Sequence, residues 1–361
     1  MIKRVLDKYL KTVWKDPERK PFGQIVGEAV RFSVRKKTLP TAYFTRLLYK
    51  KRNTRYLDYT SNPTVTFLQK HYNDPSFVPV LENKYLYHLF FKEQGITIPN
   101  SIAYNIGNIF FVGSERLIVE DTEMFRKLLY RIIGRCKKNN VLFMKEVAGA
   151  WGKGAHKISA DDLEKKNFDT ESLFRDIVSA SFIIQEAIVQ HEEINRLYPL
   201  SINSIRMDTF MDREGNVEIL SALLRMGGNG NFVDNVTAGG LFVPIDLESG
   251  KLGKRAQTFL KNGAKSHEAH PYTGTPFEGF AVPFFDEAKQ LVKKAAEKIP
   301  ALRLVGWDVV ITPEGPLLLE GNHLYHIGMS EMAYGGYLKH PVFRKALHEA
   351  GLSADEEKKE K

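Results

Sequence analysis

Two carboxylate side chains and one amide side chain lie in the short stretch between residues 306 and 322 of the 361-residue chain. Asp308 stands in one apolar segment, and Glu320 and Asn322 end the next, with a Pro-Glu-Gly turn signal between the segments. On paired antiparallel strands Asp308 and Glu320 can face one another, and Asn322 shares the face of Glu320. Three oxygen donors on one pleated face suit Mg²⁺. The alternative is a polar row facing solvent, which the many neighbouring Val and Leu residues disfavour.

A lysine precedes a glycine-rich segment in the middle of the chain. Lys145 ends a predicted strand, and Gly149, Gly152 and Gly154 follow it. Glycines allow backbone N–H groups to turn inward around an anion such as a phosphate, and a nearby lysine adds positive charge. The segment is neither a Walker A loop nor a GxGxxG sequence before a helix. An ordinary hairpin turn is therefore the alternative interpretation.

Two arginines lie inside largely apolar predicted strands. Arg206 and Arg225 each need an anionic partner if those strands are buried. The partner could be Asp208, Asp234 or the phosphate of a ligand. Asn235, Gly239 and Gly240 follow in a glycine-rich loop, and four histidines are found further along: His267, His270, His323 and His326. One histidine could act as a base, and the alternative for each is a structural or substrate-positioning role.

These residues need an antiparallel scaffold rather than a parallel one. Helices are predicted over 82–94, 122–138, 171–180 and 283–298. Strands are predicted over 95–99 (after a turn), 141–145, 155–159, 182–189, 204–211, 218–226, 241–246, 303–312 and 316–321. Residues 255–283 are predicted to form a long functional loop. Because strands far outnumber crossover helices after residue 200, an α+β fold is favoured over a parallel Rossmann sheet.

Composition and charge narrow the class of protein. With 43% hydrophobic, 26% charged and 11% aromatic residues, the chain is expected to be globular, and no apolar run is long enough for a transmembrane helix. Its one cysteine, Cys136, favours a reducing, cytoplasmic compartment. Residues 1–60 hold 16 Lys/Arg and 5 Asp/Glu, whereas the remainder holds 36 and 38. Apolar residues recur at helical spacing over residues 2–14, with Lys and Arg mostly outside that stripe. This predicts a basic amphipathic helix that either binds an anionic membrane surface or glycan, or packs on the protein itself. No nucleic-acid partner is expected, since no base-reading motif follows.

Taken in order, these elements resemble the ATP-grasp superfamily of carboxylate–amine ligases. The resemblance runs from Asn83-Lys84 to Asn322 and includes the strand lysine with its glycine loop, the strand ending at Gln185-Glu186, and the two arginine strands. Residues 203–206, 222–225 and 235–240 look like ligases of the glutamate-adding type. Together with residues 305–308 and 270–274, the whole pattern looks closest to the sugar-transfer-associated ATP-grasp group.

The resemblance implies an α+β fold with two lobes that clamp a nucleotide. Residues 1–75 would form a basic helical extension, which does not look like the usual N-terminal pre-domain. Residues 76–190 would form the N-terminal lobe with the glycine-rich loop, and 191–350 the C-terminal lobe with the metal site. Residues 351–361 are expected to be a disordered tail.

The resemblance also implies roles for single residues. Lys84 and Lys145 would contact ATP phosphates, with Gly149, Gly152 and Gly154 closing over them. Adenine would lie against Glu186, Ala187 and Ile188, and Glu193 would hold the ribose. The residues that would bind Mg²⁺ or Mn²⁺ are Asp308, Glu320 and Asn322. Those that would act in catalysis are Arg225, Arg206 and Asn235. Those that would contact substrate are His270, Gly239, Gly240 and His323. Glu146 departs from many relatives, which have proline after the lysine, and this could alter the loop.

The implied reaction is ADP-forming amide synthesis through an acyl phosphate. The substrates would be a small carboxylate and an amine, one of them linked to a sugar, in the biosynthesis of a cell-surface polysaccharide or a related conjugate. The alternatives are an ATP-dependent kinase, a peptide ligase of secondary metabolism, or a catalytically inactive binding module. The expected location is the cytoplasm, with the inner face of the membrane as the variant that the basic N-terminal region suggests.

Overall fold

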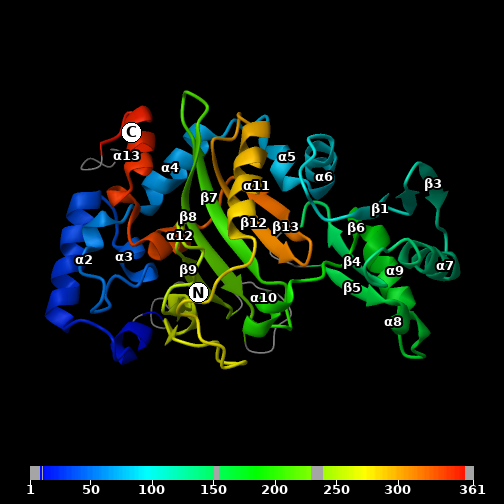
Figure 1. Cartoon of the computed structure of the whole chain (residues 1–361), viewed down its shortest axis with the longest axis horizontal. Coiled ribbons are helices and arrows are strands. Elements are labelled where there is room, and N and C mark those ends of the chain that lie inside the picture. Colours follow the sequence, from blue (N-terminus) through cyan, green and yellow to red (C-terminus); the bar gives the residue numbers. More distant parts are fainter. Residues whose placement is uncertain (1–8, 10, 150–153, 229–238, 354–361) are drawn as a thin grey trace.

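The computed structural model describes residues 9, 11–149, 154–228 and 239–353. Three parts follow one another along the long axis: N-terminal helices, a large sheet and a small sheet (Figure 1). Neighbouring strands in both sheets run antiparallel, which confirms the expected α+β class. The region boundaries at residues 75 and 190 stay predictions.

The small sheet has the strand order β3-β2-β1-β6-β4-β5. Its strands are β1 (Ser101–Ile106), β2 (Ile109–Val112), β3 (Glu115–Ile118), β4 (Val141–Glu146), β5 (His156–Ser159) and β6 (Phe182–Glu186). Its helices are α7 (Thr122–Ile133), α8 (Ala160–Glu164) and α9 (Thr170–Ser179). The Asp121 side chain caps α7 by accepting a hydrogen bond from the Met124 amide at 2.7 Å. Strands β1 to β3 were not predicted, and the strand expected over 95–99 begins instead at Ser101.

The large sheet has the order β11-β10-β9-β8-β7-β12-β13. Its strands are β7 (Ser204–Met211), β8 (Val217–Met226), β9 (Leu241–Ile245), β10 (Ala256–Gln257), β11 (Ser266–His267), β12 (Leu304–Thr312) and β13 (Gly315–Asn322). Strands β7 and β12 are buried along their whole length. Helix α11 (Phe285–Lys298) packs on one face, and α4 (Asn62–Tyr72), α12 (Ile327–Tyr334) and α13 (Pro341–Glu349) pack on the other. The loop expected over 255–283 also contains β10, β11 and the short helix η3 (Leu260–Asn262).

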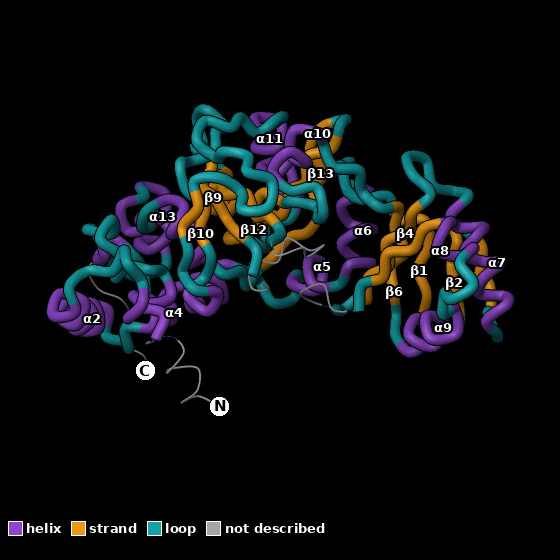
Figure 2. The backbone as a smooth tube through the Cα atoms, turned by 90° about the horizontal axis from the view of Figure 1, so that it is seen from below, coloured by secondary structure: helices purple, strands orange, loops and turns teal. Residues whose placement is uncertain are grey.

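Helices α5 (Val78–Glu82) and α6 (Lys84–Glu93) lie between the two sheets (Figure 2). The short helix α10 (Glu192–Leu197) follows the small sheet, and η4 (Tyr337–Lys339) connects α12 to α13. The N-terminal part contains α2 (Phe22–Lys36), α3 (Thr41–Thr45) and η1 (Tyr56–Asp58). It packs against the end of the large sheet, where the Lys50 ammonium donates to the Ala264 carbonyl at 2.6 Å. Most of the basic helix expected over 2–14, and most of the tail after 351, lie outside the described residues.

Candidate functional site

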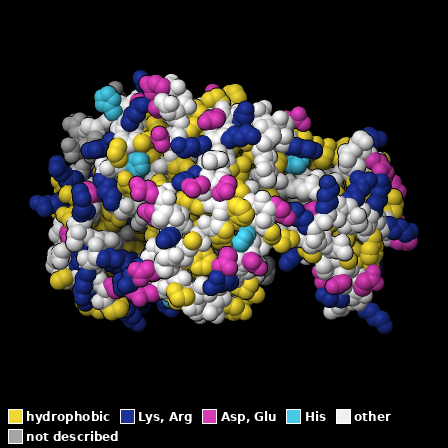
Figure 3. Space-filling model, in the orientation of Figure 1, with side chains coloured by type: hydrophobic (Ala, Val, Ile, Leu, Met, Phe, Trp, Pro, Cys, Tyr) yellow, Lys and Arg dark blue, Asp and Glu magenta, His cyan; other side chains and the backbone are white. Residues whose placement is uncertain are grey.

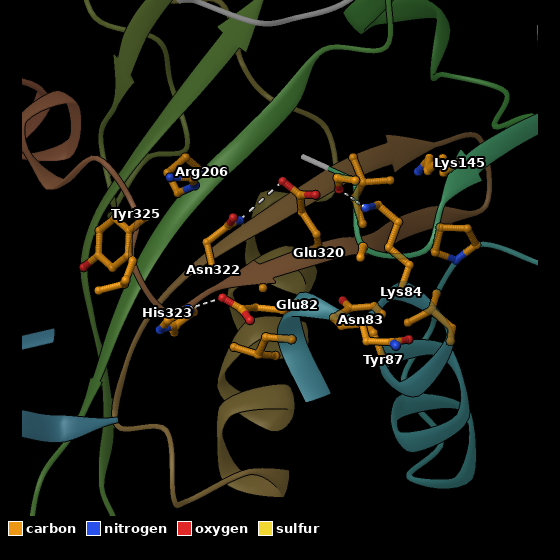
Figure 4. Close-up of a pocket in the computed structure, with 18 of the residues that line it drawn as sticks. Glu82, Asn83, Lys84, Tyr87, Lys145, Arg206, Glu320, Asn322, His323 and Tyr325 are labelled. Carbon is orange, nitrogen blue, oxygen red and sulfur yellow. Dashed lines mark hydrogen bonds and ion pairs between the residues drawn. The ribbon is translucent and has the colours of Figure 1, made fainter. Parts of the chain in front are cut away.

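A cavity of about 800 Å³ lies between the two sheets and beside α5 and α6. Four cationic side chains line it: Lys84 from α6, Lys145 from β4, Arg206 from β7 and Arg225 from β8. Glu320 and Asn322 of β13 enter it from the large sheet, opposite Lys145 (Figure 4). The structure therefore brings together residues from all three groups that the sequence singled out.

Asp308 lies directly behind this lining and has no solvent exposure. Its carboxylate accepts from the Arg206 guanidinium at 2.6 and 3.1 Å, and Arg225 pairs with it at 2.9 Å. Burial alone would raise the pKa of Asp308, but the two guanidinium groups outweigh it and hold the pKa well below its ordinary value. The anionic partner of both arginines is thus Asp308, which was not among the partners considered from the sequence.

Glu320 faces Asp308 across the β12–β13 hairpin, as the sequence predicted. Burial and the adjacent Asp308 charge raise the pKa of Glu320 to about 7. The Asn322 amide donates weakly to Glu320 and Asp308 at 3.4 and 3.5 Å, so its own oxygen stays available. Glu320 and Asn322 face the cavity with Asp308 behind them, and these oxygens are the candidate donor set for a hard divalent cation. Both Asp308 oxygens already accept from guanidinium groups, so Glu320 and the Asn322 amide are the donors that face the cavity. Among the described residues, no group of three His, Cys, Asp or Glu side chains is placed to hold a metal, so the amide is essential to that set.

Lys84 is placed by the start of α6. The Asn83 side chain caps the helix by accepting from the Tyr85 and Leu86 amides, both at 3.0 Å. The Lys84 ammonium then reaches the Gly149 carbonyl at the beginning of the glycine-rich segment (Figure 4). Burial lowers the pKa of Lys84, while the Glu320 and Glu146 charges act in the opposite direction.

The glycine-rich segment approaches the cavity from the small sheet. The Lys145 ammonium lies 5.3 Å from the centre of the Phe143 ring. A Cβ atom on Gly149 would stand 2.9 Å from that of Glu146, so this turn requires glycine. Gly154 adopts a positive φ of 66°, whereas Gly152 lies outside the described residues.

The residues expected around adenine and ribose do not line this cavity. The Glu186 carboxylate accepts from the backbone amides of Lys137, Lys138 and Asn139, which lowers its pKa although burial opposes this. The Ala187 amide donates to the Val141 carbonyl at 2.9 Å, extending the sheet, and Ile188 follows it half-buried. Glu193 pairs with Arg196 at 2.6 Å on the surface. The nucleotide roles implied for these residues stay predictions.

The expected substrate residues are divided between two places. His323 lines the cavity, and its Nε2 lies 2.9 Å from the Glu82 carboxylate. His270 is buried elsewhere, where its Nε2 lies 3.1 Å from the Gly227 carbonyl and its ring stacks on Tyr198. Gly239 and Gly240 do not line the cavity. Gly239 lies close to Gly228 instead, because a Cβ atom on Gly228 would stand only 2.9 Å from the Gly239 carbonyl oxygen.

Three further residues were named from the sequence: the histidines His326 and His267, and the loop residue Asn235. His326 lines the cavity and His267 does not. Asn235 lies outside the described residues.

Several cavity residues were missed by the sequence analysis. They are Glu82, Tyr87, His88, Gln185, Phe259, Tyr325 and Met329. Tyr87 and His88 follow Lys84 on α6, so continuing the helical face from the Asn83-Lys84 pair could have found them. No local sequence pattern indicated Tyr325, because the sequence does not show that the chain passes close to Gly306 after β13. In the structure the two residues are in contact, since a Cβ atom on Gly306 would stand 2.7 Å from the Tyr325 ring.

Solved structures with similar backbones have low sequence identity. The ATP-grasp ligase PsnB, in complex with a precursor peptide and AMPPNP, is 16% identical with a TM-score of 0.42 over 78% of this chain and 62% of that chain. An ADP complex of N5-carboxyaminoimidazole ribonucleotide synthetase is 10% identical (TM-score 0.41, 75% and 53%). D-alanyl-alanine synthetase A from Vibrio cholerae is 14% identical (TM-score 0.38, 76% and 62%). The chain thus spans between about half and two thirds of each of these proteins.

Sequence comparisons define the family. No curated protein sequence matches the chain. The sequence profile described as sugar-transfer associated ATP-grasp matches residues 65–345, which include both sheets and every cavity-lining residue. The chain therefore belongs to the sugar-transfer associated ATP-grasp family.

Proposed function

We propose that the protein is an ATP-dependent carboxylate–amine ligase that forms an acyl phosphate. A carboxylate does not condense with an amine at neutral pH, so its oxygen must first take the γ-phosphoryl group of ATP, which releases ADP. The amine then attacks the carbonyl carbon, phosphate leaves, and an amide remains. Both steps require neutralised phosphate charge and exclusion of water more than covalent help from the protein.

The observation that carries this proposal is the charge pattern of the cavity. Lys84 and Lys145 enter from the side of α6 and the small sheet, and Glu320 and Asn322 enter from the large sheet. Lysines suit phosphate oxygens as compact point charges. We assign Asp308, Glu320 and Asn322 to Mg²⁺, which Mn²⁺ could replace; bound there, the ion would neutralise charge on the phosphates.

Arg225 is our candidate for stabilising the reacting carbonyl. Its side chain is 15% exposed, while that of Arg206 is 6% exposed and makes two contacts with Asp308. Arg225 also donates to the Ser204 hydroxyl at 2.6 Å. We therefore assign Arg225 to the developing oxyanion and Arg206 to holding Asp308 in place. His323, oriented by Glu82, is our candidate for accepting the amine proton.

The substrates are proposed only by class. We propose a sugar acid or amino acid as one substrate, with the product used in a cell-surface polysaccharide; the description of the family as sugar-transfer associated supports this choice. An enzyme of such a pathway would work in the cytoplasm or at the inner face of the membrane.

The test is a screen of carboxylates and amines for ADP release, with mass spectrometry of the products. An amide formed together with ADP and phosphate is the expected result. A phosphorylated hydroxyl with no amide would instead identify a kinase. Glu320→Gln is the inactive comparison, and Glu218→Gln makes the same chemical change on an exposed carboxylate of β8 that does not line the cavity.

A further inference from the structure

One face of helix α2 exposes an uninterrupted row of apolar side chains. Phe22, Val26, Val30 and Val34 recur every fourth residue, so they lie on the same side of the helix. Their exposed fractions are 57, 46, 58 and 70%. The helix does not need these residues for its own packing, because Ile25, Ala29 and Phe32 on an adjacent side are buried in the N-terminal core.

Neighbouring residues widen this row into a surface. Gly23 and Gly27 lie beside it, and a Cβ on either would meet nothing within 4 Å. Trp14 and Leu39 are 62 and 79% exposed, and the Trp14 ring contacts Phe22 edge to face at 5.7 Å. We call Trp14, Phe22, Val26, Val30, Val34 and Leu39 the α2 apolar face. Contiguous exposed apolar surface of this kind marks an interaction site more often than scattered single residues do.

The α2 apolar face is bordered by positive charge. Lys11, Lys15, Arg31, Arg35 and Lys37 are all exposed. Lys and Arg side chains are prominent at the end of the molecule that α2 forms (Figure 3). Helix α2 contains a single acidic residue, Glu28, whose carboxylate is engaged by Lys20 at 2.6 Å and by the Tyr43 hydroxyl at 2.8 Å. The border therefore offers cations without competing exposed carboxylates from α2.

We propose that the α2 apolar face docks on an anionic lipid bilayer. A surface with a tryptophan, valines and a phenylalanine, bordered by Lys and Arg, matches the boundary between acyl chains and anionic headgroups. A second copy of this chain would place one basic border against another, and an anionic glycan has no hydrocarbon to cover the valines. Among the described helices none is long and apolar enough to cross a membrane, so the contact is peripheral. This proposal does not depend on the ligase activity.

The experiment measures sedimentation of the full-length protein with vesicles. Neutral phosphatidylcholine vesicles are compared with vesicles that also contain phosphatidylserine, at low and high salt. The apolar variant is Val30→Glu/Val34→Glu. The matched control is Ile106→Glu/Ile118→Glu, which makes the same change at two residues of the small sheet that are 59 and 48% exposed. The charge variant is Arg31→Ala/Arg35→Ala.

We expect the parent protein to bind anionic vesicles at low salt and to dissociate as salt increases. The apolar variant and the charge variant should each weaken this binding by about tenfold or more, and the control should bind like the parent. Melting curves check folding; if the glutamates lower the melting temperature, Val30→Ser/Val34→Ser replaces them.

Three results would overturn the proposal. The first is no binding of the parent at low salt, and the second is equal binding by parent and apolar variant. The third is a dimer in light scattering that the apolar variant dissociates while the parent does not bind vesicles, since this would make the face a contact between two copies. A soluble anionic polysaccharide serves as competitor: binding that it abolishes, and that the apolar variant leaves unchanged, indicates a glycan site instead.

Discussion

Replacing Glu320 with glutamine should stabilise the ligand-free protein above pH 7 and remove its response to Mg-ATP. Burial and the charge of Asp308 raise the pKa of Glu320 to about 7, from an ordinary value of 4.5. A carboxyl group with a raised pKa binds its proton more tightly in the folded protein than in the unfolded chain. Its contribution to stability is therefore fully present below pH 4.5 and is lost as the pH rises to about 7.

The size of this effect follows from the two pKa values. The interval from 4.5 to about 7 corresponds to about 3 kcal/mol in the free energy of unfolding, because one pKa unit is worth about 1.4 kcal/mol. Glu320 also borders the open cavity, where solvent weakens the repulsion. We therefore expect Glu320→Gln to raise the free energy of unfolding by about 1–2 kcal/mol above pH 7, and to have little effect near pH 4.5.

The assay is chemical denaturation at several pH values, followed by melting with and without Mg-ATP. The parent should gain stability from Mg-ATP because the ligand binds only the folded state, whereas Glu320→Gln should lose most of this gain and nearly all turnover. Glu82→Gln, which neutralises an exposed carboxylate of the same cavity, should keep the gain in stability from Mg-ATP, although it removes the carboxylate that orients His323. A Glu320→Gln protein that is less stable than the parent above pH 7, yet still gains full stability from Mg-ATP, would refute the metal assignment.

Three other substitutions have different expected outcomes. Asp308→Asn should destabilise the ligand-free protein by about 3–5 kcal/mol, seen in denaturant unfolding, because it leaves two arginines without their buried carboxylate; unchanged unfolding would contradict this pairing. Lys145→Ala should weaken ATP binding by about tenfold or more in calorimetry without lowering the melting temperature, and unchanged affinity would count against its role. Asn322→Ala should reduce turnover less than Glu320→Gln in a steady-state ADP assay, because it removes a dipole and no charge; an equal loss would show that its amide matters more than its charge suggests.

The hairpin that carries the proposed metal ligands was predictable from the sequence. Its two apolar segments and its turn at residues 313–315 indicated two antiparallel strands on which Asp308 and Glu320 could face one another. Counting residues away from that turn would pair Asp308 with Leu319, and a β-bulge between Asp308 and Val309 moves Asp308 opposite Glu320. The same reasoning found the strands around Lys145 and Arg206. Strands β1 to β3 escaped it because each is short and is joined to the next by a tight glycine turn, at Gly107 and Gly113.

The partner of the two arginines was not predictable in the same way. Arg206 lies opposite Asp308 because β7 and β12 are neighbours in the sheet, although 102 residues separate the two side chains. No local pattern indicates which distant strands pair, so Asp208, two residues from Arg206 on the same strand, was the nearer choice. Asp208 is instead buried, with the Tyr337 hydroxyl at 3.0 Å, and burial raises its pKa to about 7.

The charge of the cavity explains why the proposed site would stay competent without ligand. Lys84, Lys145 and the two arginines outnumber the carboxylates of Glu82, Asp308 and Glu320 by one positive charge, while Glu146, whose charge also acts on Lys84, does not line the cavity. The excess grows when Glu320 is protonated, as its raised pKa allows near neutrality. Mg-ATP brings about two negative charges that face this cationic lining, and a divalent cation beside Glu320 would favour its ionised form. Without Mg-ATP, the two arginines keep Asp308 ionised, and protonation of Glu320 limits the repulsion between the two carboxylates. The same residues would therefore serve both the ligand-free and the ligand-bound protein without a change of fold.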